Sequence, residues 1–529
     1  MLKALPIGTS TFRKIIEREQ LYVDKTRDIY ELITGGDVYF LSRPRRFGKS
    51  LLLSTLKEIF EGHRELFAGL WIYKSAYQWE KYPVLRIDFS QLKVRTAAEL
   101  ESGLGRYLRR LARQHQLELE TGAYYEQFAD LIQQLAEKGK VVVLIDEYDK
   151  PLVDNLQNVA EARRIREVLR GFYTVLKGMD EYLRFVLLTG VSKFSKVGVF
   201  SGLNNLKDIT LDNRFATMLG VTQDEINKYL LEHVRAFAEN EGWTELELLA
   251  QMKIWYDGFS FSKKCARVYN PFSLLLLLDM QDFRNYWFES GTPTFLIKLI
   301  REQEYDIQLM EDLVVDELAF SSYEIGHLNV IPLLFQTGYL TIQSYDPAAR
   351  LYKLYYPNYE VENAFSRYLL NSFVTGEPGL AGGYLWRLAE ALRARDWEKF
   401  FAVLRIFLAD IPYDIQLPRE KYYQTIFYLL FKLIGLQIGA EVRTNRGRID
   451  AVVETADGIF IFEFKLDASP AVALAQIRAR GYAEQYSLRD AIYLIGVEFG
   501  VLERNVVAWQ VEQLYAETPD GDPACATML

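Results

Sequence analysis

A basic loop near the amino terminus carries residue types that can bind the phosphates of a nucleotide. An apolar run, VYFLS, precedes the loop RPRRF, and Gly48, Lys49 and Ser50 then begin a helical pattern. Backbone N–H groups at a helix N-terminus carry partial positive charge, so with Lys49 they can hold the β and γ phosphates of ATP or GTP while Ser50 binds Mg²⁺. Arg46 and Gly48 would complete this cradle. Arg43 stands where the pattern G-x-x-x-x-G-K-[ST] has its first glycine, so the context must decide.

An acidic strand end supplies that context. Residues 141–147 read VVVLIDE, an apolar run that ends in Asp146 and Glu147. In a parallel sheet, the carboxyl ends of buried strands border the ligand crevice. We expect Asp146 to hold Mg²⁺ through water and Glu147 to polarise the water that attacks ATP. Taken alone, the segment is better interpreted as a core strand followed by a solvated acidic turn, but together with Lys49 it favours an ATP site.

Three charged residues near the carboxyl terminus form a second constellation. Residues 447–454 and 459–466 read as two strands joined by the turn TADG, with Asp450 on the first strand and Glu463 and Lys465 on the second. Because strand side chains alternate, Glu463 and Lys465 share one face, while the phenylalanines at positions 460, 462 and 464 face a core. A turn centred on residues 456–457 or 457–458 places Asp450 opposite Glu463 or Lys465.

These groups have the composition of a metal site that hydrolyses phosphodiester bonds. Two carboxylates and the Phe464 carbonyl are hard oxygen ligands for Mg²⁺ or Mn²⁺, and the Lys465 ammonium can orient a metal-activated water. The alternative is a cross-strand salt bridge on a wet face. Glu420, at the start of an upstream helix, is either a further acid for the metal or a helix N-terminal charge. Gln476 and Tyr482, downstream, are either contacts to the metal water or the DNA backbone, or surface residues.

The elements that position the first site alternate in type. Strands are expected at Val38–Ser42, 84–89, 141–145 and 185–189, with helical periodicity over 97–116 and 160–177. This pattern predicts a doubly wound α/β domain with a parallel sheet. Thr189 ends the last of these strands, and Ser192 follows it. Either residue could sense the γ-phosphate, or both could be ordinary polar residues at a strand terminus.

Length and composition fit a large protein of several domains. The chain has 529 residues, of which 50% are hydrophobic, and its net charge of −9 argues against a generally basic nucleic-acid coat while leaving room for a local positive channel. Cys265 and Cys525 cannot build a disulfide framework and fit a reducing cytosol. The amino terminus has no apolar signal core, and the longest leucine run, at 274–278, is too short to span a bilayer. We expect a cytoplasmic protein without membrane contact.

The whole chain resembles the bacterial family in which an AAA-ATPase-like domain is joined to a C-terminal PD-(D/E)XK nuclease domain. The resemblance rests on the motifs LPIG at 5–8, YVDKT at 22–26, SRPRRFGKS at 42–50, YNPFS at 269–273, NYW at 285–287 and GRID at 447–450. It implies a P-loop NTPase sheet at residues 1–215, a helical lid at 216–301, a middle region at 302–385 and a nuclease-like α/β domain at 386–529.

The same resemblance implies roles for individual residues. The family's phosphate loop has arginine at the position of Arg43. The residues implied to bind ATP and Mg²⁺ are Lys49, Ser50, Asp146 and Glu147. The nuclease site consists of Asp450, Glu463 and Lys465, with Glu420 and Gln476 as flanking positions. The proline of the nuclease motif is Ile449 here, which removes no metal ligand, and Gln424 stands where relatives would have histidine.

Two functions follow from these patterns. In the first, the protein is an ATP-dependent nuclease whose C-terminal hairpin cuts DNA and whose ATPase closes or assembles subunits, so that a homo-oligomer is a possible partner state. In the second, it is an ATP-switched binding protein whose inactive nuclease-like domain binds a nucleic acid or a protein without cleaving it. The presence of all three residues Asp450, Glu463 and Lys465 favours the first.

Overall fold

The computed structural model describes most of the chain. The described residues are 2–193, 199–200, 203, 205–289, 296–297, 299–300, 303, 305, 307–310, 313–320, 329–374, 380–411, 420–438, 441–444, 450–455, 458–481, 483–486 and 491–515; within them, the side chains of 308–309, 373, 380–381, 420–424, 436–438, 441–444, 450, 485 and 515 are outside the description. The chain divides into two compact units, the first comprising Met1–Gln303 and Asp312–Val361, the second Glu304–Glu311 and Glu362–Leu529.

A five-stranded parallel sheet forms the core of the first unit. Its order is β2-β3-β4-β1-β5, with bounds Val84–Asp88, Val141–Asp146, Leu183–Gly190, Val38–Ser42 and Lys207–Asp208. Every residue of β3 is buried, as expected for a central strand covered on both faces. Because β4 lies between β1 and β3, the carboxyl ends of these three strands meet at one edge of the sheet. The predicted parallel sheet is confirmed.

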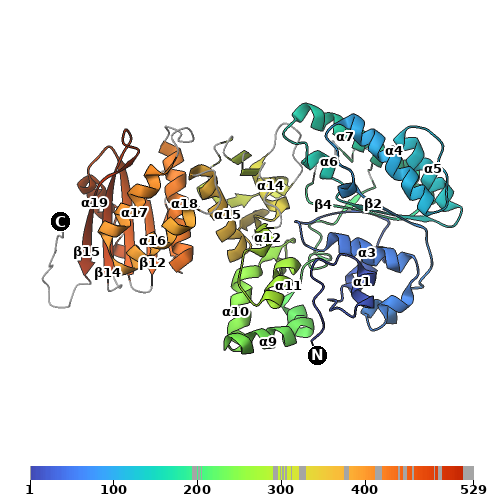
Figure 1. Cartoon of the computed structure of the whole chain (residues 1–529), viewed down its shortest axis with the longest axis horizontal. Helices are drawn as coiled ribbons and strands as arrows, with labels where there is room; N and C mark the ends of the chain where they lie inside the picture. Colours follow the sequence, from blue (N-terminus) through green and yellow to red (C-terminus); the bar gives the residue numbers. More distant parts are fainter. Residues whose placement is uncertain are drawn as a thin grey trace. The chain divides into compact units, whose positions relative to one another are not determined.

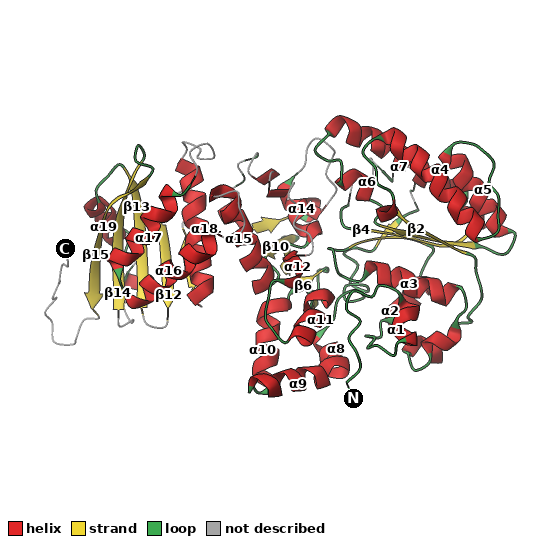
Figure 2. Ribbon diagram, in the orientation of Figure 1, coloured by secondary structure: helices red, strands yellow, loops and turns green. Residues whose placement is uncertain are grey.

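Helices cover both faces of this sheet (Figure 1; Figure 2). Helices α1 (Phe12–Glu17), α2 (Thr26–Thr34) and α3 (Lys49–Phe60) lie on one face, and α4 (Ala97–Gln114), α5 (Tyr124–Ala136) and α7 (Val159–Gly178) lie on the other. The helices predicted at 97–116 and 160–177 correspond to α4 and α7. Helix α3 follows β1 directly after the basic loop, so the sheet and the helix fix both ends of that loop.

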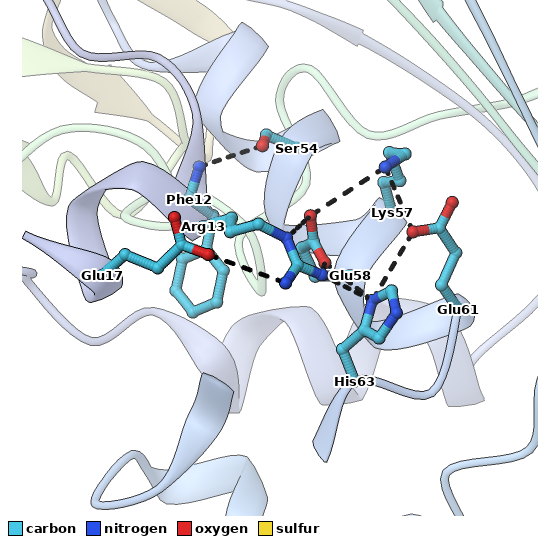
Figure 3. A network of polar contacts seen from close by, with 8 residues as sticks. All are labelled: Phe12, Arg13, Glu17, Ser54, Lys57, Glu58, Glu61 and His63. Carbon is cyan, nitrogen blue, oxygen red and sulfur yellow. Dashed lines mark hydrogen bonds and ion pairs between the residues drawn. The ribbon is translucent and has the colours of Figure 1, made fainter. Parts of the chain in front are cut away.

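A polar network ties α1 to α3 (Figure 3). Glu58 of α3 is 3% exposed, and its Oε2 accepts from Arg13 Nη2 of α1 at 2.6 Å and lies 2.8 Å from His63 Nδ1. The Phe12 backbone N donates to Ser54 Oγ of α3 at 3.0 Å. Such buried, charge-assisted bonds fix α1 firmly on α3. Because α1 follows directly on residues 6–10, the network also fixes the position of that segment, which borders the cavity described below.

Helices follow the sheet in the first unit. They comprise α9 (Leu231–Glu241), α10 (Glu245–Tyr256), α11 (Pro271–Met280) and α12 (Tyr286–Glu289), which share one apolar core, together with a small sheet of β6 (Phe259–Ser260) and β7 (Arg267–Val268). Asn270 caps α11 by accepting from the backbone N of Phe272 and Ser273, and Pro271 occupies its first turn. The sequence YNPFS is therefore a helix start.

Further elements of the first unit follow these helices along the chain. They are α14 (Val330–Thr337) and an antiparallel sheet of β8 (Leu313–Val315), β9 (Thr341–Asp346) and β10 (Leu351–Tyr355) in the order β8-β10-β9. Helix α15 (Tyr359–Val374) then begins in the first unit and continues into the second.

A mixed five-stranded sheet forms the second unit. Its order is β11-β12-β13-β14-β15, with bounds Glu441–Thr444, Asp450–Thr455, Gly458–Leu466, Ala491–Gly500 and Asn505–Tyr515, and only β13 and β14 run parallel. Helix α19 (Pro470–Ala479) connects that parallel pair and packs on one face of β13. Helices α17 (Trp397–Ala409) and α18 (Glu420–Ile438) pack on the other face, and α16 (Leu380–Ala394) precedes them. Within the described residues, none of the helices combines the length and apolar character needed to cross a membrane.

Candidate functional sites

The basic loop between β1 and α3 takes the conformation that a phosphate cradle requires. Gly48 is the N-cap of α3 with φ +87°, and a Cβ at this position would point into open space, so the backbone is accessible there. Arg46 also has a positive φ, of +66°. The first N–H groups of α3 have no intrahelical acceptor and face outward from the loop. Gly48, Lys49 and Ser50 therefore begin the helix as predicted.

Arg43 does not enter the cradle. Its guanidinium is buried, with Nη1 donating to the carbonyls of Ser42 (2.9 Å) and Thr210 (2.7 Å) and Nη2 donating to that of Phe215 (3.2 Å). It also lies 4.2 Å from the centre of the Phe261 ring. Burial lowers the pKa of Arg43 to about 9. The residue that replaces the first motif glycine thus fastens the loop to segments that come much later in the chain, a role that the sequence did not indicate.

Lys49 lies at the centre of the cradle. Its Nζ donates to the carbonyls of Arg43 at 2.8 Å and Pro44 at 2.9 Å. Burial lowers the pKa of Lys49 to about 8, a shift that the negative charges of Asp146, Asp149 and Glu147 partly oppose. The ammonium is therefore poised close to its titration range in a site that lies near three acids.

The acids at the end of β3 lie at the same edge of the sheet. Asp146 is 2% exposed; its Oδ1 accepts from Thr189 Oγ1 at 2.9 Å, and its Oδ2 lies 3.8 Å from Arg86 Nη2. Glu147 has a positive φ of +49°, which turns the chain away from the strand. Burial, with the nearby charges of Asp146 and Asp149, raises the pKa of Glu147. A carboxylate with a raised pKa is a better general base near neutral pH.

Asp149 is a site residue that sequence reasoning missed. It is 2% exposed and accepts from the backbone N of Val191 at 3.2 Å and of Ser192 at 2.6 Å. Burial raises its pKa, although the hydrogen bonds from Ser192 oppose this shift. The chain passes so close at Gly190 that a Cβ there would lie 2.6 Å from Asp149 Oδ1. The sequence did contain a signal for Asp149. It is a third acid, three residues after Asp146, and a glycine ends the next strand.

One cavity of about 520 Å³ joins these groups. The loop, the acids, the amino-terminal segment and the helices after the sheet all contribute to its wall, through Arg45, Arg46, Gly48, Lys49, Ser50, Asp146, Glu147, Asp149, Ser192, Pro6, Gly8, Thr9, Ser10, Pro271, Phe272, Leu275, Trp287 and Phe288 among others. Thr189 is not part of this wall, because it is fully buried behind Asp146. The structure thus brings together all predicted residues of this site except Thr189, which reaches the cavity only through Asp146.

A smaller apolar cavity of about 110 Å³ adjoins the first. The two cavities share Pro6, Gly48, Leu51, Pro271 and Leu275. The remaining wall is largely aliphatic and aromatic, with Val23, Ile29, Phe47 and Leu230 among its members. A polar cavity that continues into an apolar one suits a ligand with a charged end and a flat apolar end.

The hairpin in the second unit has one of the two registers that we predicted. Asp450 pairs with Glu463 and Thr455 with Gly458, so residues 456–457 connect the strands. Directly opposed residues of an antiparallel pair lie on the same face. The backbone thus places Asp450 and Glu463 at one position on the sheet, while the Asp450 side chain lies outside the described residues.

Glu463 is a buried carboxylate with one oxygen paired. It is 0% exposed; Oε1 accepts from Lys465 Nζ at 2.6 Å, and Oε2 has no hydrogen-bond partner among the described residues. The neighbouring phenylalanines face the opposite side, where the ring of Phe462 lies 4.7 Å from that of Phe431 and the ring of Phe464 lies 4.5 Å from that of Phe427. The predicted alternation of charged and core positions along β13 is therefore confirmed.

The flanking positions are described only in part. Glu420 is the first residue of α18, as expected for a helix start, but its side chain is outside the description. Gln476 is half-buried on α19, next to the buried Ile477. Tyr482 lies outside the described residues. The structure therefore does not show either Glu420 or Gln476 beside Glu463.

Comparisons with known proteins match both units. A family model described as a predicted AAA-ATPase matches residues 6–200, and a model of the PD-(D/E)XK nuclease superfamily matches residues 418–509. Over 526 residues the chain is 39% identical to a protein of Azotobacter chroococcum mcd 1 described as an uncharacterized protein in the vnfD 5′ region, and the match covers 97% of this chain and 99% of that protein.

Proposed function

Because the chain belongs to the family that joins a predicted AAA-ATPase domain to a PD-(D/E)XK nuclease superfamily domain, we propose that it binds and hydrolyses ATP in the first unit and cleaves DNA phosphodiester bonds in the second. The observation that supports the first activity best is the single cavity that gathers Lys49, Ser50 and the acids at the end of β3. The observation that supports the second is the buried Glu463 oxygen that has no hydrogen-bond partner in the described part of the chain.

The cavity of the first unit fits a nucleotide triphosphate with its metal. Its volume of about 520 Å³ lies within the range of about 300–1,000 Å³ typical of small-molecule sites. The phosphates would lie on the N-terminus of α3 and against Lys49, and the base would enter the adjoining apolar cavity. The Ser50 hydroxyl and the Asp146 carboxylate are the hard oxygen donors that Mg²⁺ requires. Thr189 would hold Asp146 in place by its hydrogen bond.

Glu147 is the residue that we assign to water activation. Its pKa is raised by burial and by the neighbouring carboxylates, so it can accept a proton near neutral pH. Helix α11 contributes Pro271, Phe272 and Leu275 to the same cavity, which supports the proposal that residues 216–301 act as a lid over the nucleotide.

The hairpin of the second unit fits a divalent cation. A buried carboxylate oxygen without a hydrogen-bond partner is costly, and binding to a cation would offset that cost. Glu463 offers such an oxygen, and Asp450 lies opposite it in the backbone register. Mg²⁺ or Mn²⁺ bound there would supply an activated water and neutralise a phosphodiester. Lys465, whose Nζ already reaches the Glu463 carboxylate, would orient that water.

One experiment separates this proposal from an ATP-switched module with an inactive nuclease-like domain. Purified protein is incubated with plasmid and oligonucleotide DNA, with and without Mg²⁺ or Mn²⁺ and ATP, beside the variants Asp450→Ala and Lys49→Ala, while ATP hydrolysis is measured in parallel. We expect metal-dependent cleavage by the wild type and loss of cleavage in Asp450→Ala. Cleavage that survives Asp450→Ala would assign the activity to another site, and ATP binding without any cleavage would favour the module.

We also propose a cytoplasmic location and DNA as the partner. The two cysteines fit a reducing compartment, and the chemistry of the hairpin fits a phosphodiester substrate. Self-association would be a further means of coupling ATP to cleavage.

A further inference from the structure

One tryptophan joins the phosphate loop to a helix that lies far along the chain. The Trp287 indole Nε1 donates to the Arg45 carbonyl at 3.1 Å, and the backbone N of Trp287 donates to Glu360 Oε1 at 2.6 Å. Trp287 is 6% exposed and Glu360 is 0% exposed, so the bond between them is shielded from water, which strengthens it, while the bond to Arg45 is partly buried. Trp287 also lines the nucleotide cavity. The same residue therefore contacts the loop and the cavity with its side chain and Glu360 with its backbone N–H.

The other oxygen of Glu360 holds the lid. Ser273 Oγ, in the first turn of α11, donates to Glu360 Oε2 at 2.8 Å. The neighbouring Phe272 lines the cavity, and its ring lies 4.7 Å from the guanidinium carbon of Arg46 in the loop. One buried carboxylate thus connects two elements that both contact the phosphate loop.

Glu360 lies in the first turn of α15. The boundary between the two units falls after Val361, so this helix starts in the first unit and continues into the second. In the second unit, Glu362 of the same helix forms an ion pair with Lys432 of α18 at 2.9 Å. A helix moves as a rigid element, so a displacement of its first turn is carried along its length.

The packing around Trp287 leaves little room to absorb a movement of the loop. A Cβ at Gly338, which has φ +93°, would lie 2.8 Å from Pro44 Cβ and 3.2 Å from Trp287 Cζ2. The Trp287 ring also lies 5.3 Å from the Tyr339 ring and 6.2 Å from the Phe259 ring, both edge-on. Closely packed interiors transmit strain rather than dissipate it.

We propose that Trp287 and Glu360 relay the state of the phosphate loop to helix α15, so that ATP binding in the first unit changes the second unit. This inference rests on the proposed ATP site. Lys49 Nζ donates two of its three N–H groups to the carbonyls of Arg43 and Pro44, and a phosphate that binds the ammonium would draw Nζ away from these carbonyls. The loop carbonyls then rearrange, and the Arg45 carbonyl displaces the indole that holds it. Because Glu360 binds the backbone of the same tryptophan, the displacement reaches the first turn of α15.

The relay is tested by hydrogen–deuterium exchange of the full chain with and without saturating ATP and Mg²⁺. Trp287→Phe removes the indole donor but keeps an aromatic ring, and Glu360→Gln weakens the carboxylate contacts from the α15 side. Trp243→Phe is the matched control, because Trp243 is an exposed tryptophan of the same unit that does not line the cavity. ATP affinity is measured for every protein by titration calorimetry.

We expect ATP to change the exchange rates of peptides from α15 in the wild type and equally in Trp243→Phe. In Trp287→Phe and in Glu360→Gln, each saturated with ATP, that change should fall by at least half, and Glu360→Gln, whose altered residue does not line the cavity, should bind ATP within about tenfold of the wild-type Kd, as loss of one net hydrogen bond implies. An ATP-bound wild type without any change in α15, or a change that persists in both variants, would overturn the relay. Absence of ATP binding by the wild type would instead overturn the proposed ATP site.

Discussion

At the scale of single residues, Arg43 shows that a residue that departs from a motif can stabilise the loop that carries it. Its buried guanidinium donates to three carbonyls and covers an aromatic ring, so the loop is fixed from behind while its front stays open to the cavity. A glycine at this position would leave those carbonyls without that donor. A buried acceptor that loses its partner destabilises the fold.

Restoring the motif glycine should therefore weaken the protein. We expect Arg43→Gly to lower the free energy of unfolding of the first unit by about 2–4 kcal/mol, because it empties a buried volume and leaves acceptors unpaired. Arg45→Gly is the control, because Arg45 lies in the same loop with an exposed side chain. Chemical unfolding followed by tryptophan fluorescence measures both. Equal unfolding curves for the two variants would show that Arg43 is not a structural anchor.

The protonation of Lys49 should make ATP binding depend on pH. The pKa of Lys49 is about 8, so the amine of the free protein is charged at pH 7 and largely neutral at pH 9. Because only the ammonium binds phosphate strongly, ATP binding above pH 8 must take up a proton, and the affinity should fall by about tenfold between pH 7 and pH 9. Lys49→Met should bind weakly with a flat profile. Titration calorimetry at several pH values measures this, and a flat profile for the wild type would contradict it.

At the scale of elements, the register of β12 and β13 decides which charges meet. The pairing of Thr455 with Gly458 places Asp450 opposite Glu463. A shift of one residue would turn Glu463 to the face where Phe427 and Phe431 of α18 pack. The packing of aromatic residues on that face therefore fixes the register of β12 and β13, and this register fixes Asp450 opposite Glu463. The carboxylate pair is a consequence of how the strand packs on its opposite side.

Removing the charge of Glu463 should separate stability from activity. We expect Glu463→Gln to lose at least a hundredfold in metal-dependent cleavage, because the amide is a poor ligand for Mg²⁺. Its unfolding free energy without metal should stay within about 1 kcal/mol of the wild type, because removal of the buried charge of Glu463 offsets the loss of its ion pair with the partly exposed Lys465. Plasmid cleavage and thermal unfolding measure the two effects, with the exposed Glu503→Gln as the control. A variant that loses stability and activity in parallel would mark Glu463 as structural.

At the scale of the whole molecule, the two proposed phosphate chemistries belong to two separate units of one chain. The cavity lies entirely within the first unit and the hairpin within the second, and α15 is a continuous helix that belongs to both. Each unit buries its own core, so neither site needs the other in order to form. Helix α15 is one route by which ATP in the first unit would act on the proposed cleavage in the second.

Loss of ATP binding should therefore abolish the effect of ATP on the cleavage rate while the nuclease site stays intact. We expect the cleavage rate of the wild type to change when ATP is added, and that of Lys49→Ala to stay the same with and without ATP. Lys57→Ala, which alters an exposed lysine later on the same helix, is the control and should respond like the wild type. Initial rates of plasmid cleavage at fixed Mg²⁺ provide the measurement. A Lys49→Ala protein that still responds to ATP would show that the nucleotide acts elsewhere.

The sequence by itself determined the elements and the chemistry they present. Apolar runs and helical periodicity predicted the sheet of the first unit because burial on both faces demands continuous apolar strands. The hairpin was predictable because strand alternation and a short turn fix a register within a narrow choice. Lys49, Asp146, Glu463 and Lys465 were recognisable because the residue types that bind phosphate and metal are few.

Only the tertiary structure decided what depends on contacts between distant segments. Several of these contacts join residues whose spacing follows no local period. They are the bonds of Arg43 to Thr210 and Phe215, the bond of Thr189 to Asp146, the position of Asp149 in the cavity wall, and the bonds of Trp287 to Arg45 and Glu360. Local pattern reports which face of an element is apolar. It does not report which element meets that face, because the order of strands and the path of the chain between them are set by the packing of the whole unit.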